Sequence, residues 1–475
     1  MKKYINYLFA MTLLFLISCQ DDDLDPSPAD AFTPETFYKT PSDFTAASRG
    51  MYSGMIAGTY YGGSMLSRPD IMTDNVILAQ IGRRSNQFFY EWRFVPNSTW
   101  NLMSRAYIIN NRANRIIESI DNLPDGSIKN NFLGEAKAVR AFVMFDLLRL
   151  YSKLPTQSSD ALSSLGMPIV TTTEPDIQEL RPTVQETLDF VINELEDARS
   201  LIAADNGNTR FDKDGVNALL SRVYLYSGNY DLSVARANAV LEPIASRVEF
   251  SDIWTDSNSA GVILKIDQDR SLDGITVGVE WSQSGDAGLI PEYVATKELA
   301  DLYENNDIRK TAYLSTLPDS NGDLYNAIVK MFGEAGQQNG IVDPKLIRKA
   351  EVILNKAEAQ YKSTSFSDAD ALQTLDLLRN NRYAGFVSPN ETGQSLLESI
   401  LLERRLELAF EGHRFFDLKR LNLPVNRSST EGEFFDGSGT PAQFNSLPNT
   451  DHRFQMAIPQ SQINIFPAFQ QNPGY

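Results

Sequence analysis

Most of the chain carries the hydrophobic spacing of amphipathic helices. In residues 100–120, apolar and small side chains recur three or four positions apart and share one helical face. Residues 132–151 are apolar nearly all round, and a helix of that composition is buried. A third stripe covers residues 184–202 and follows Thr183, which can form a capping box with Glu186. The pattern predicts a mostly helical protein.

The spacing of small residues predicts a pair of packed helices in residues 218–241. A tetratricopeptide hairpin has a small–Gly–Tyr–small pattern that lets its two helices approach closely. The chain approximates this pattern with Ser221, Gly228, Tyr230 and Ser233. We expect Gly228 to turn the chain between the two helices. A second hairpin is expected from residues 345–361 and 368–382, and a third helical region from residues 396–420.

Other segments do not follow helical spacing. Residues 262–266 and 275–282 have the composition of strands, within a Gly/Asp/Ser-rich loop region at residues 250–295. Residues 428–450 are rich in Gly, Ser, Thr, Asn and Pro, which is typical of a long loop. Residues 59–99 mix aromatic and polar side chains without clear periodicity. We therefore predict a mainly α fold with a few short strands and three irregular, loop-rich segments.

The N-terminus has the features of a lipoprotein signal peptide. Two lysines precede a mostly apolar stretch at residues 4–17, which is shorter than the about 20 residues of a membrane span and typical of a secretory signal. It runs into Leu-Ile-Ser-Cys at residues 16–19, which resembles a bacterial lipobox, and Cys19 is the only cysteine of the chain. The resemblance implies cleavage after residue 18 and lipidation of Cys19. The alternative is an ordinary signal peptide with an incidental cysteine.

An extended tether is expected after the lipid anchor. Residues 20–25 are mostly acidic, and such a run resembles the surface-export signal of Bacteroidetes lipoproteins; a merely solvated tether is the alternative. The stretch is kept extended by Pro26, Pro28 and Pro34. We assign residues 1–18 to the signal peptide, residues 19–34 to the tether and residues 35–475 to a single folded domain.

Composition excludes several classes of function. The chain has 43 Lys and Arg against 61 Asp and Glu, and its net charge of −18 disfavours nucleic acid, whose phosphates need clustered basic residues. One Cys and two His exclude Cys-rich and His-rich metal sites. The P-loop, GxGxxG, GxSxG and HExxH motifs are absent. We therefore expect no cofactor, no metal and no nucleic-acid partner.

Residues 319–323 imitate the start of a calcium loop with Asp319, Asn321 and Asp323. A calcium loop needs Gly at its sixth position and Glu at its twelfth, where this chain has Leu324 and Lys330. We interpret the segment as an ordinary polar turn.

The densest group of charges lies in residues 403–420. Three glutamates there are four residues apart and share one helical face. Paired carboxylates also serve in glycosidases, but the neighbouring arginines would keep these ionised, which is the wrong state for a general acid. We predict no catalytic residues and a structural ion-pair network. Its members are Glu403, Arg404, Glu407, Glu411, Arg414 and Asp417.

Three charged segments resemble a known family, the SusD/RagB family of Bacteroidetes nutrient-binding lipoproteins. They are EAKAVRAF at residues 135–142, RKAEVILNKAEA at 348–359 and ERRLELAFEGHRFFDLKR at 403–420. The end of the chain, with Ile458-Pro459 and the final QQNPGY, looks like the family's ending. With the lipobox at the other end, the resemblance covers essentially the whole chain.

The resemblance implies a scaffold of four tetratricopeptide-like hairpins, wound as a right-handed superhelix, with irregular segments over one side. It implies an outer-membrane, cell-surface lipoprotein that binds an oligosaccharide, or less often a peptide. Such a protein acts as the lid of a SusC-like TonB-dependent transporter. The chain is compact for this family. Two other functions stay open from the sequence: a surface glycoside hydrolase, and a lid that only gates the transporter.

The candidate ligand residues lie on the irregular segments, because binding residues gather on loops held by a rigid scaffold. Sugar rings stack on aromatic side chains, and polar groups fix their hydroxyls. In residues 59–99 and 270–295 the candidate stacking platforms are Tyr61, Phe89, Trp92 and Trp281. The candidate hydrogen-bonding residues are Asp74, Asn75 and Arg83.

Overall fold

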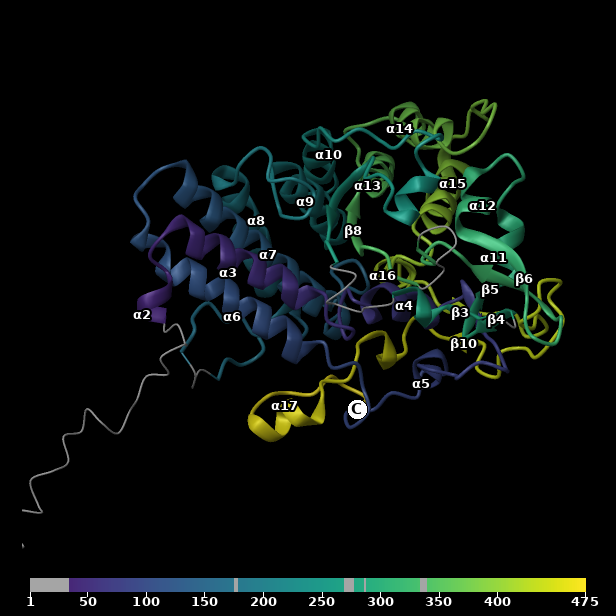
Figure 1. Cartoon of the computed structure of the whole chain (residues 1–475), viewed down its shortest axis with the longest axis horizontal. Helices are drawn as coiled ribbons and strands as arrows, with labels where there is room; N and C mark the ends of the chain where they lie inside the picture. The colour runs from purple at the N-terminus through teal and green to yellow at the C-terminus, as the bar shows by residue number, and fades with distance from the viewer. Residues whose placement is uncertain (1–33, 175–177, 269–276, 286–287, 334–339) are drawn as a thin grey trace, which may run out of the picture.

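The computed structural model of the protein is shown in Figure 1, and it describes residues 34–174, 178–268, 277–285, 288–333 and 340–475. The predicted signal peptide, Cys19 and the acidic part of the tether lie outside the described residues. Within the described ranges, no helix combines the length and the apolar composition that crossing a membrane requires.

An array of packed helices forms the scaffold, in which each long helix packs against the next. Its first part is built from α3 (Pro41–Met55), α6 (Met103–Ser119), α7 (Ser127–Tyr151), α8 (Val184–Leu201), α9 (Lys213–Ser227) and α10 (Tyr230–Asn238). The array continues through α13 (Lys349–Lys362), which packs against α10, α14 (Asp368–Asn380) and α15 (Gly393–Glu407). The mainly α, tetratricopeptide-like fold predicted from the sequence is confirmed.

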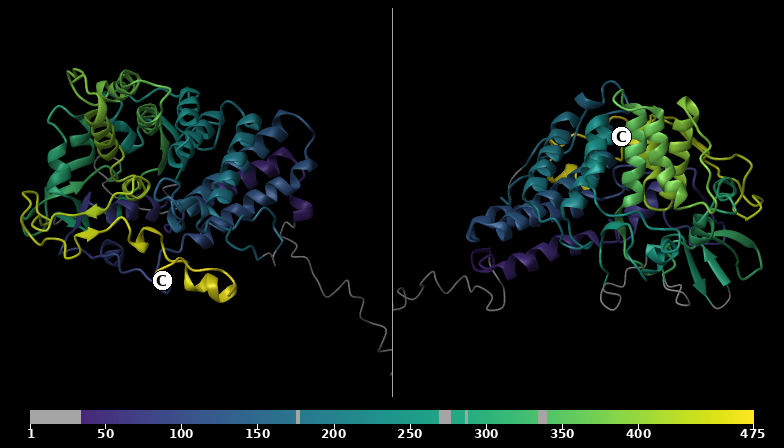
Figure 2. Two further views of the ribbon diagram at one scale, coloured as in Figure 1. Left: turned by 180° about the vertical axis from the view of Figure 1, so that it is seen from behind. Right: turned by 90° about the horizontal axis from the view of Figure 1, so that it is seen from above.

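Most of the short strands gather toward the end of the molecule that lies away from α2 and α3, as the views in Figures 1 and 2 show. The described strands form two-stranded antiparallel sheets: β1 (Val76–Leu78) with β5 (Tyr293–Ala295), β2 (Val262–Lys265) with β8 (Lys345–Arg348), β3 (Ser282–Gly285) with β4 (Gly288–Pro291), β6 (Leu314–Pro318) with β7 (Leu324–Ile328), and β9 (Val425–Asn426) with β10 (Ser446–Leu447). The short helices of the chain are α2 (Pro34–Phe37), α4 (Ser64–Ile71), α5 (Gln87–Tyr90), α11 (Lys297–Leu302), α12 (Ile308–Tyr313), α16 (Arg414–Arg420) and α17 (Gln460–Ile465).

Two local predictions are confirmed in atomic detail. Thr183 and Glu186 form the capping box that starts α8. Gly228 ends α9 in the left-handed conformation, with φ of 78°, and α10 begins two residues later. The Ser233 hydroxyl donates to the Ser221 carbonyl at 2.8 Å, so small residues do hold the two helices of this hairpin together.

Two element predictions are wrong in their bounds, and one predicted helical region is divided. Residues 345–348 form strand β8, which is buried throughout and pairs with β2, so the helix begins only at Lys349. The helical region predicted at residues 396–420 consists of two helices, α15 and α16. The chain breaks between them because Phe410 and Gly412 adopt positive φ values of 66° and 79°. Residues 277–280 form a 3-10 helix where a strand was expected, and residues 275–276 lie outside the described ranges.

The turn between β6 and β7 is polar, as the sequence predicts. Asp319 accepts hydrogen bonds from the backbone N–H groups of Asn321 at 2.8 Å and Asp323 at 3.0 Å, and so closes the turn. Among the described residues, no group of three or more His, Cys, Asp or Glu side chains is arranged to hold a metal ion.

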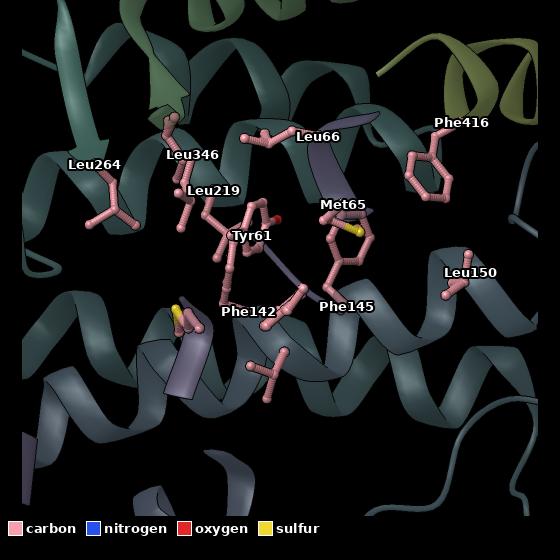
Figure 3. Close-up of a cluster of buried hydrophobic side chains, with 14 of the residues drawn as sticks. Tyr61, Met65, Leu66, Phe142, Phe145, Leu150, Leu219, Leu264, Leu346 and Phe416 are labelled. Atoms are coloured by element: carbon pink, nitrogen blue, oxygen red, sulfur yellow. The ribbon is translucent and has the colours of Figure 1, made fainter. Parts of the chain in front are cut away.

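A continuous core joins the irregular segments to the scaffold. Helix α7 is at its centre, where Phe142 and Phe145 are buried, and Figure 3 shows Tyr61 and Met65 from the 59–99 segment in the same cluster. The rings of Tyr61 and Phe142 stack with centroids 5.5 Å apart. Residues 59–99 are therefore packed structure, with helix α4 and strand β1, and are less irregular than the sequence suggests.

Candidate functional site

The four candidate stacking platforms lie in the core of this structure. Tyr61, Phe89, Trp92 and Trp281 are between 0% and 3% exposed. Trp281 packs edge-on against Phe410, and the Trp92 indole N–H donates to the Met72 carbonyl at 2.9 Å. These rings attach the irregular segments to the scaffold, so the structure does not present them to a sugar. Aromatic residues in aperiodic segments have this alternative use, and spacing cannot separate the two.

Asp74 and Asn75 also face the protein rather than a ligand. Asp74 accepts two hydrogen bonds from Arg414, at 2.8 and 2.7 Å. Burial raises the pKa of Asp74, but Arg414 and Arg405 outweigh burial and hold this pKa below its usual value. The Asn75 amide donates to Asp70 at 2.8 Å and accepts from Arg405 at 2.9 Å. Both residues join the 59–99 segment to the α15–α16 region.

The six residues assigned to the ion-pair network all form ion pairs. Glu407 lies 2.9 Å from both Arg348 and Arg382, and Asp417 lies 2.8 Å from Arg404. The remaining three are paired as Glu403 with Arg309, Glu411 with Arg348 and Lys330, and Arg414 with Asp74. Burial raises the pKa of Glu407, and the arginines more than reverse that effect and hold the pKa below its usual value. Sequence reasoning missed Arg309, Lys330 and Arg382, because they come from distant segments without a shared pattern.

Arg83 is the exception among the candidate residues, because its side chain is 52% exposed. Its Nε donates to the buried Glu292 at 2.7 Å, and its Nη2 donates to the Val279 carbonyl at 3.3 Å. Gln283, with its amide oxygen turned toward Arg83, accepts from both Nη atoms at 2.9 and 3.0 Å. The two segments chosen from the sequence, residues 59–99 and 270–295, therefore meet at this side chain.

A second contact between the same segments lies beside Arg83. The Asn86 amide donates to Glu280 at 2.6 Å and accepts from Arg68 at 3.2 Å. We call Arg83, Asn86, Glu280, Gln283 and Glu292 the Arg83 cluster. Apart from the buried Glu292, its members are partly or largely exposed and present both donors and acceptors to solvent.

The backbone of the Arg83 loop is held in an unusual shape. Arg84 and Asn86 adopt positive φ values of 56° and 59°, which non-glycine residues adopt rarely. A Cβ on Gly82 would lie 2.1 Å from the Pro291 carbonyl oxygen, so only glycine permits this approach. Glu292 accepts from the backbone N–H groups of Arg83 at 2.8 Å and Ser85 at 3.1 Å. Strained backbone of this kind concentrates at functional sites, where it preorganises side chains.

A hollow of about 350 Å³ is lined by residues from the segments 251–255, 311–317 and 329–333. It has aromatic residues at its wall, Trp254 and Phe332, and around them hydroxyl side chains from Ser251, Thr255, Thr311 and Ser315. The Phe332 carbonyl accepts from the Gly340 N–H, and the Gly340 carbonyl accepts from the Gly278 N–H, both at 2.9 Å. We call this feature the Trp254 hollow. Sequence reasoning missed it, although a Trp in a Gly/Asp/Ser-rich segment was the available signal.

Two family models match separate parts of the chain. One is described as the SusD family and matches residues 324–475; the other is described as starch-binding proteins associating with the outer membrane and matches residues 49–225. The SusD-like protein P2 of Formosa agariphila is 26% identical over the full length of both chains. The chain belongs to the SusD/RagB-like family. Glycan binding at the outer membrane is accordingly a property described for its family.

Solved structures resemble this SusD/RagB-like protein over nearly its whole length. A SusD superfamily protein from Bacteroides thetaiotaomicron is 24% identical, covers 91% of this chain and 100% of its own, and has a TM-score of 0.79. A SusD-like carbohydrate binding protein from Bacteroides vulgatus is 22% identical, covers 92% and 99%, and has a TM-score of 0.78. These likenesses establish the fold.

Proposed function

We propose that this protein binds an oligosaccharide at the Arg83 cluster and delivers it to a SusC-like TonB-dependent transporter of the outer membrane. The observation that carries the proposal is the meeting of two separate loop segments in one solvent-facing polar cluster, on a SusD/RagB-like scaffold. Binding residues on loops held by a rigid scaffold are the usual arrangement of such sites.

The chemistry of the cluster suits a saccharide. A sugar hydroxyl both donates and accepts hydrogen bonds, so it needs donors and acceptors close together. Arg83 and Gln283 supply donors, and Glu280 and Asn86 supply acceptor oxygens. The Trp254 hollow adds hydroxyl groups, and its volume falls in the range of about 300 to 1,000 Å³ that is common for ligand pockets. We propose that it holds a further sugar unit.

The attachment to the membrane belongs to the same proposal. Residues 1–18 direct export, Cys19 carries the lipid, and residues 19–34 tether the domain of residues 35–475 at the cell surface. More than one acyl chain gives stable anchoring, whereas a single chain is marginal. Support comes from the lipobox and from a family model described as associating with the outer membrane.

Binding without hydrolysis is the form of the proposal that the site favours. A glycosidase needs two carboxylates across a bound sugar, one of them free to protonate the leaving group. In the described part of the cluster, Glu292 is buried against Arg83 and Glu280 is held by Asn86. We therefore propose no catalytic role for either carboxylate.

Calorimetry on the chain that starts at residue 19 and carries Cys19→Ala tests the proposal. The glycan panel begins with maltooligosaccharides, because one matching family model is described as starch-binding. We expect Arg83→Ala to weaken binding at least 10-fold, since it removes the guanidinium that joins the cluster. Arg93→Ala is the matched control, because Arg93 is 54% exposed and also pairs with a glutamate, Glu91, but lies outside the cluster.

The controls separate the competing functions. Equal loss of affinity in Arg83→Ala and Arg93→Ala would contradict the site. A panel without any binder would favour a lid that only gates the transporter. New reducing ends during incubation would favour the hydrolase.

A further inference from the structure

Phe435 is more exposed than any other aromatic side chain in the described ranges. It is 42% exposed, whereas the other described tryptophans, tyrosines and phenylalanines are buried or half-buried. It lies in the loop of residues 428–450, the third loop-rich segment that the sequence indicates, and it belongs to neither the Arg83 cluster nor the Trp254 hollow. Single exposed apolar residues are common on proteins, so the surroundings of this ring decide what it means.

The residue before it, Phe434, has the ordinary structural role of a loop aromatic. Its ring meets Tyr325 of β7 edge-on, with centroids 5.3 Å apart, and it packs against an apolar cluster at that strand. Phe435 joins no aromatic pair and no apolar cluster in the part of the chain that the structure describes. Phe434 therefore attaches the loop to the protein, and the ring of Phe435 is not used for that attachment.

Hydrogen bonds fix the backbone at Phe435. Its N–H donates to the Leu324 carbonyl at 2.9 Å, and its carbonyl accepts from the Asn326 side-chain amide at 3.3 Å, so both backbone polar groups are bonded to residues of β7. On the other side, the Gly437 N–H donates to the Phe434 carbonyl at 2.9 Å. The ring therefore projects from a backbone that is held in place before any ligand arrives.

The two sides of this loop approach each other closely. A Cβ on Gly432 would lie 2.4 Å from the backbone of Gly439, so only glycine permits the approach. Glu433 is buried between them and accepts from the backbone N–H of Thr440. A loop that is ordered in this way loses little conformational entropy when it binds a ligand.

The surface beside the ring is polar. Asp436 and Thr440 are exposed, and Phe435 is the only large apolar side chain of residues 428–450 that is exposed. Leu324, on the adjoining strand, is 37% exposed and adds a small apolar area. A stable protein interface buries about 800 Å² on each partner around an apolar centre, which one ring and one leucine do not provide.

A sugar ring matches this surface better than a protein does. It offers one small apolar C–H face that stacks on an aromatic ring, and hydroxyl groups surround that face. On the protein, the carboxylate of Asp436 accepts hydrogen bonds, and the hydroxyl of Thr440 both donates and accepts them. A single flat ring with such groups on the same loop therefore fits one sugar unit of a chain.

We propose that Phe435 is a second contact for a saccharide, at which a sugar unit outside the Arg83 cluster stacks on the exposed ring. The class of ligand rests on the proposed function, whereas the contact itself uses no residue of the Arg83 cluster. Once one part of a long glycan is bound, the second contact becomes intramolecular and raises the apparent affinity. The contact therefore favours polysaccharides over short oligosaccharides.

Affinity electrophoresis in gels that contain a soluble polysaccharide tests this proposal. The protein is the chain that starts at residue 19 and carries Cys19→Ala, and the polysaccharides are amylopectin, dextran, laminarin and xyloglucan. We expect Phe435→Ala to weaken binding of the retained polysaccharide by about 5-fold. Phe435→Leu should weaken it equally, because leucine is apolar but has no flat ring, whereas Phe435→Tyr should bind as the wild type does. Leu241→Ala is the matched control, because Leu241 is an apolar side chain that is 84% exposed elsewhere, and it should change nothing.

Arg83→Ala in the same gels separates this proposal from the proposed function, and circular dichroism checks that each variant is folded. Weaker binding in Arg83→Ala with unchanged binding in Phe435→Ala would overturn the second contact alone. The opposite result would overturn the Arg83 site and leave the second contact standing. Wild-type binding by Phe435→Leu would refute stacking, and a wild type that no polysaccharide retains would overturn both proposals. If Phe435→Ala kept its polysaccharide binding but lost co-purification with a TonB-dependent transporter, the ring would belong to a protein interface instead.

Discussion

Replacing Glu407 by Gln measures the contribution of the buried ion-pair network to stability. Both oxygens of Glu407 are used: Arg382 donates to them at 2.9 and 3.1 Å, and Arg348 donates to one at 2.9 Å. The side chain is 0% exposed. The substitution keeps the shape of the side chain but removes the charge from the middle of three arginines.

The expected cost follows from which arginine loses its last carboxylate. Arg348 keeps Glu411, and Arg309 keeps Asp307 and Glu403, whereas Arg382 has no other ion-pair partner among the described residues. Removing one partner of a buried pair costs about 3 to 5 kcal/mol. Because only Arg382 is left without a carboxylate partner, we expect the free energy of unfolding to fall by about 3 kcal/mol, out of a total of about 5 to 15 kcal/mol.

Urea unfolding followed by circular dichroism measures this loss, and Glu298→Gln is the matched control. Glu298 also pairs with an arginine, Arg405 at 2.9 Å, but its side chain is 52% exposed, so the control should lose less than about 1 kcal/mol. A loss in Glu407→Gln below about 1 kcal/mol, or equal to the control, would refute the reasoning. A changed slope of the unfolding free energy against urea concentration would mean that the compactness of the unfolded or folded state has changed.

The stability difference between the wild type and Glu407→Gln should depend on pH. The pKa of Glu407 in the folded protein is lower than in the unfolded chain, because the arginines outweigh burial. Its stabilising contribution is therefore fully present above the unfolded pKa of about 4.3 and declines as the pH falls toward the folded pKa. The difference in stability between the wild type and Glu407→Gln should be largest near pH 7 and shrink below about pH 4.

Other variants test other parts of the molecule. Gly412→Ala should destabilise the fold by more than about 1 kcal/mol, because Gly412 has a φ of 79° and a Cβ there would lie 2.0 Å from the Met65 carbonyl oxygen. Thermal unfolding checks this loss. Gly385→Ala is the control, because Gly385 also has a positive φ, of 68°, but a Cβ there would meet no atom within 4 Å. Cys19→Ala should move the protein from the membrane fraction to the soluble fraction, and unchanged retention would contradict lipid anchoring. The tagged wild-type protein should co-purify with a TonB-dependent transporter from native outer membranes in mild detergent, because a lid needs a large interface; recovery without any such transporter would count against the partner.

The helical scaffold was predictable because its signals are local. Capping at Thr183, the turn at Gly228 and the amphipathic stripe of α8 each depend on residues within one or two helical turns. Strand β8 was not predictable, because a four-residue buried segment without alternating apolar and polar side chains has the same sequence pattern as the first turn of a buried helix. The break between α15 and α16 depends on the contact of Gly412 with Met65, which lies far away in the sequence.

The site was predictable only in part, for a related reason. The sequence indicated the two segments that meet at Arg83, since loops on a scaffold are where ligands bind. It did not indicate which side chains face outward, because an aromatic ring in an aperiodic segment has no spacing that fixes its direction. Trp281 therefore lies in the core, and Arg83 remains at the surface, held by a glutamate 209 residues further along the chain.

The hold of Glu292 on the Arg83 loop has a consequence for the kinetics of the proposed ligand binding. Because Glu292 fixes both the guanidinium and the backbone of this loop, a ligand does not have to order them when it arrives. Conformational entropy is then lost during folding rather than during binding, and association needs no slow rearrangement. The proposed carrier would therefore load its cargo rapidly, and the direction of transport would be set by the proposed transporter that receives it.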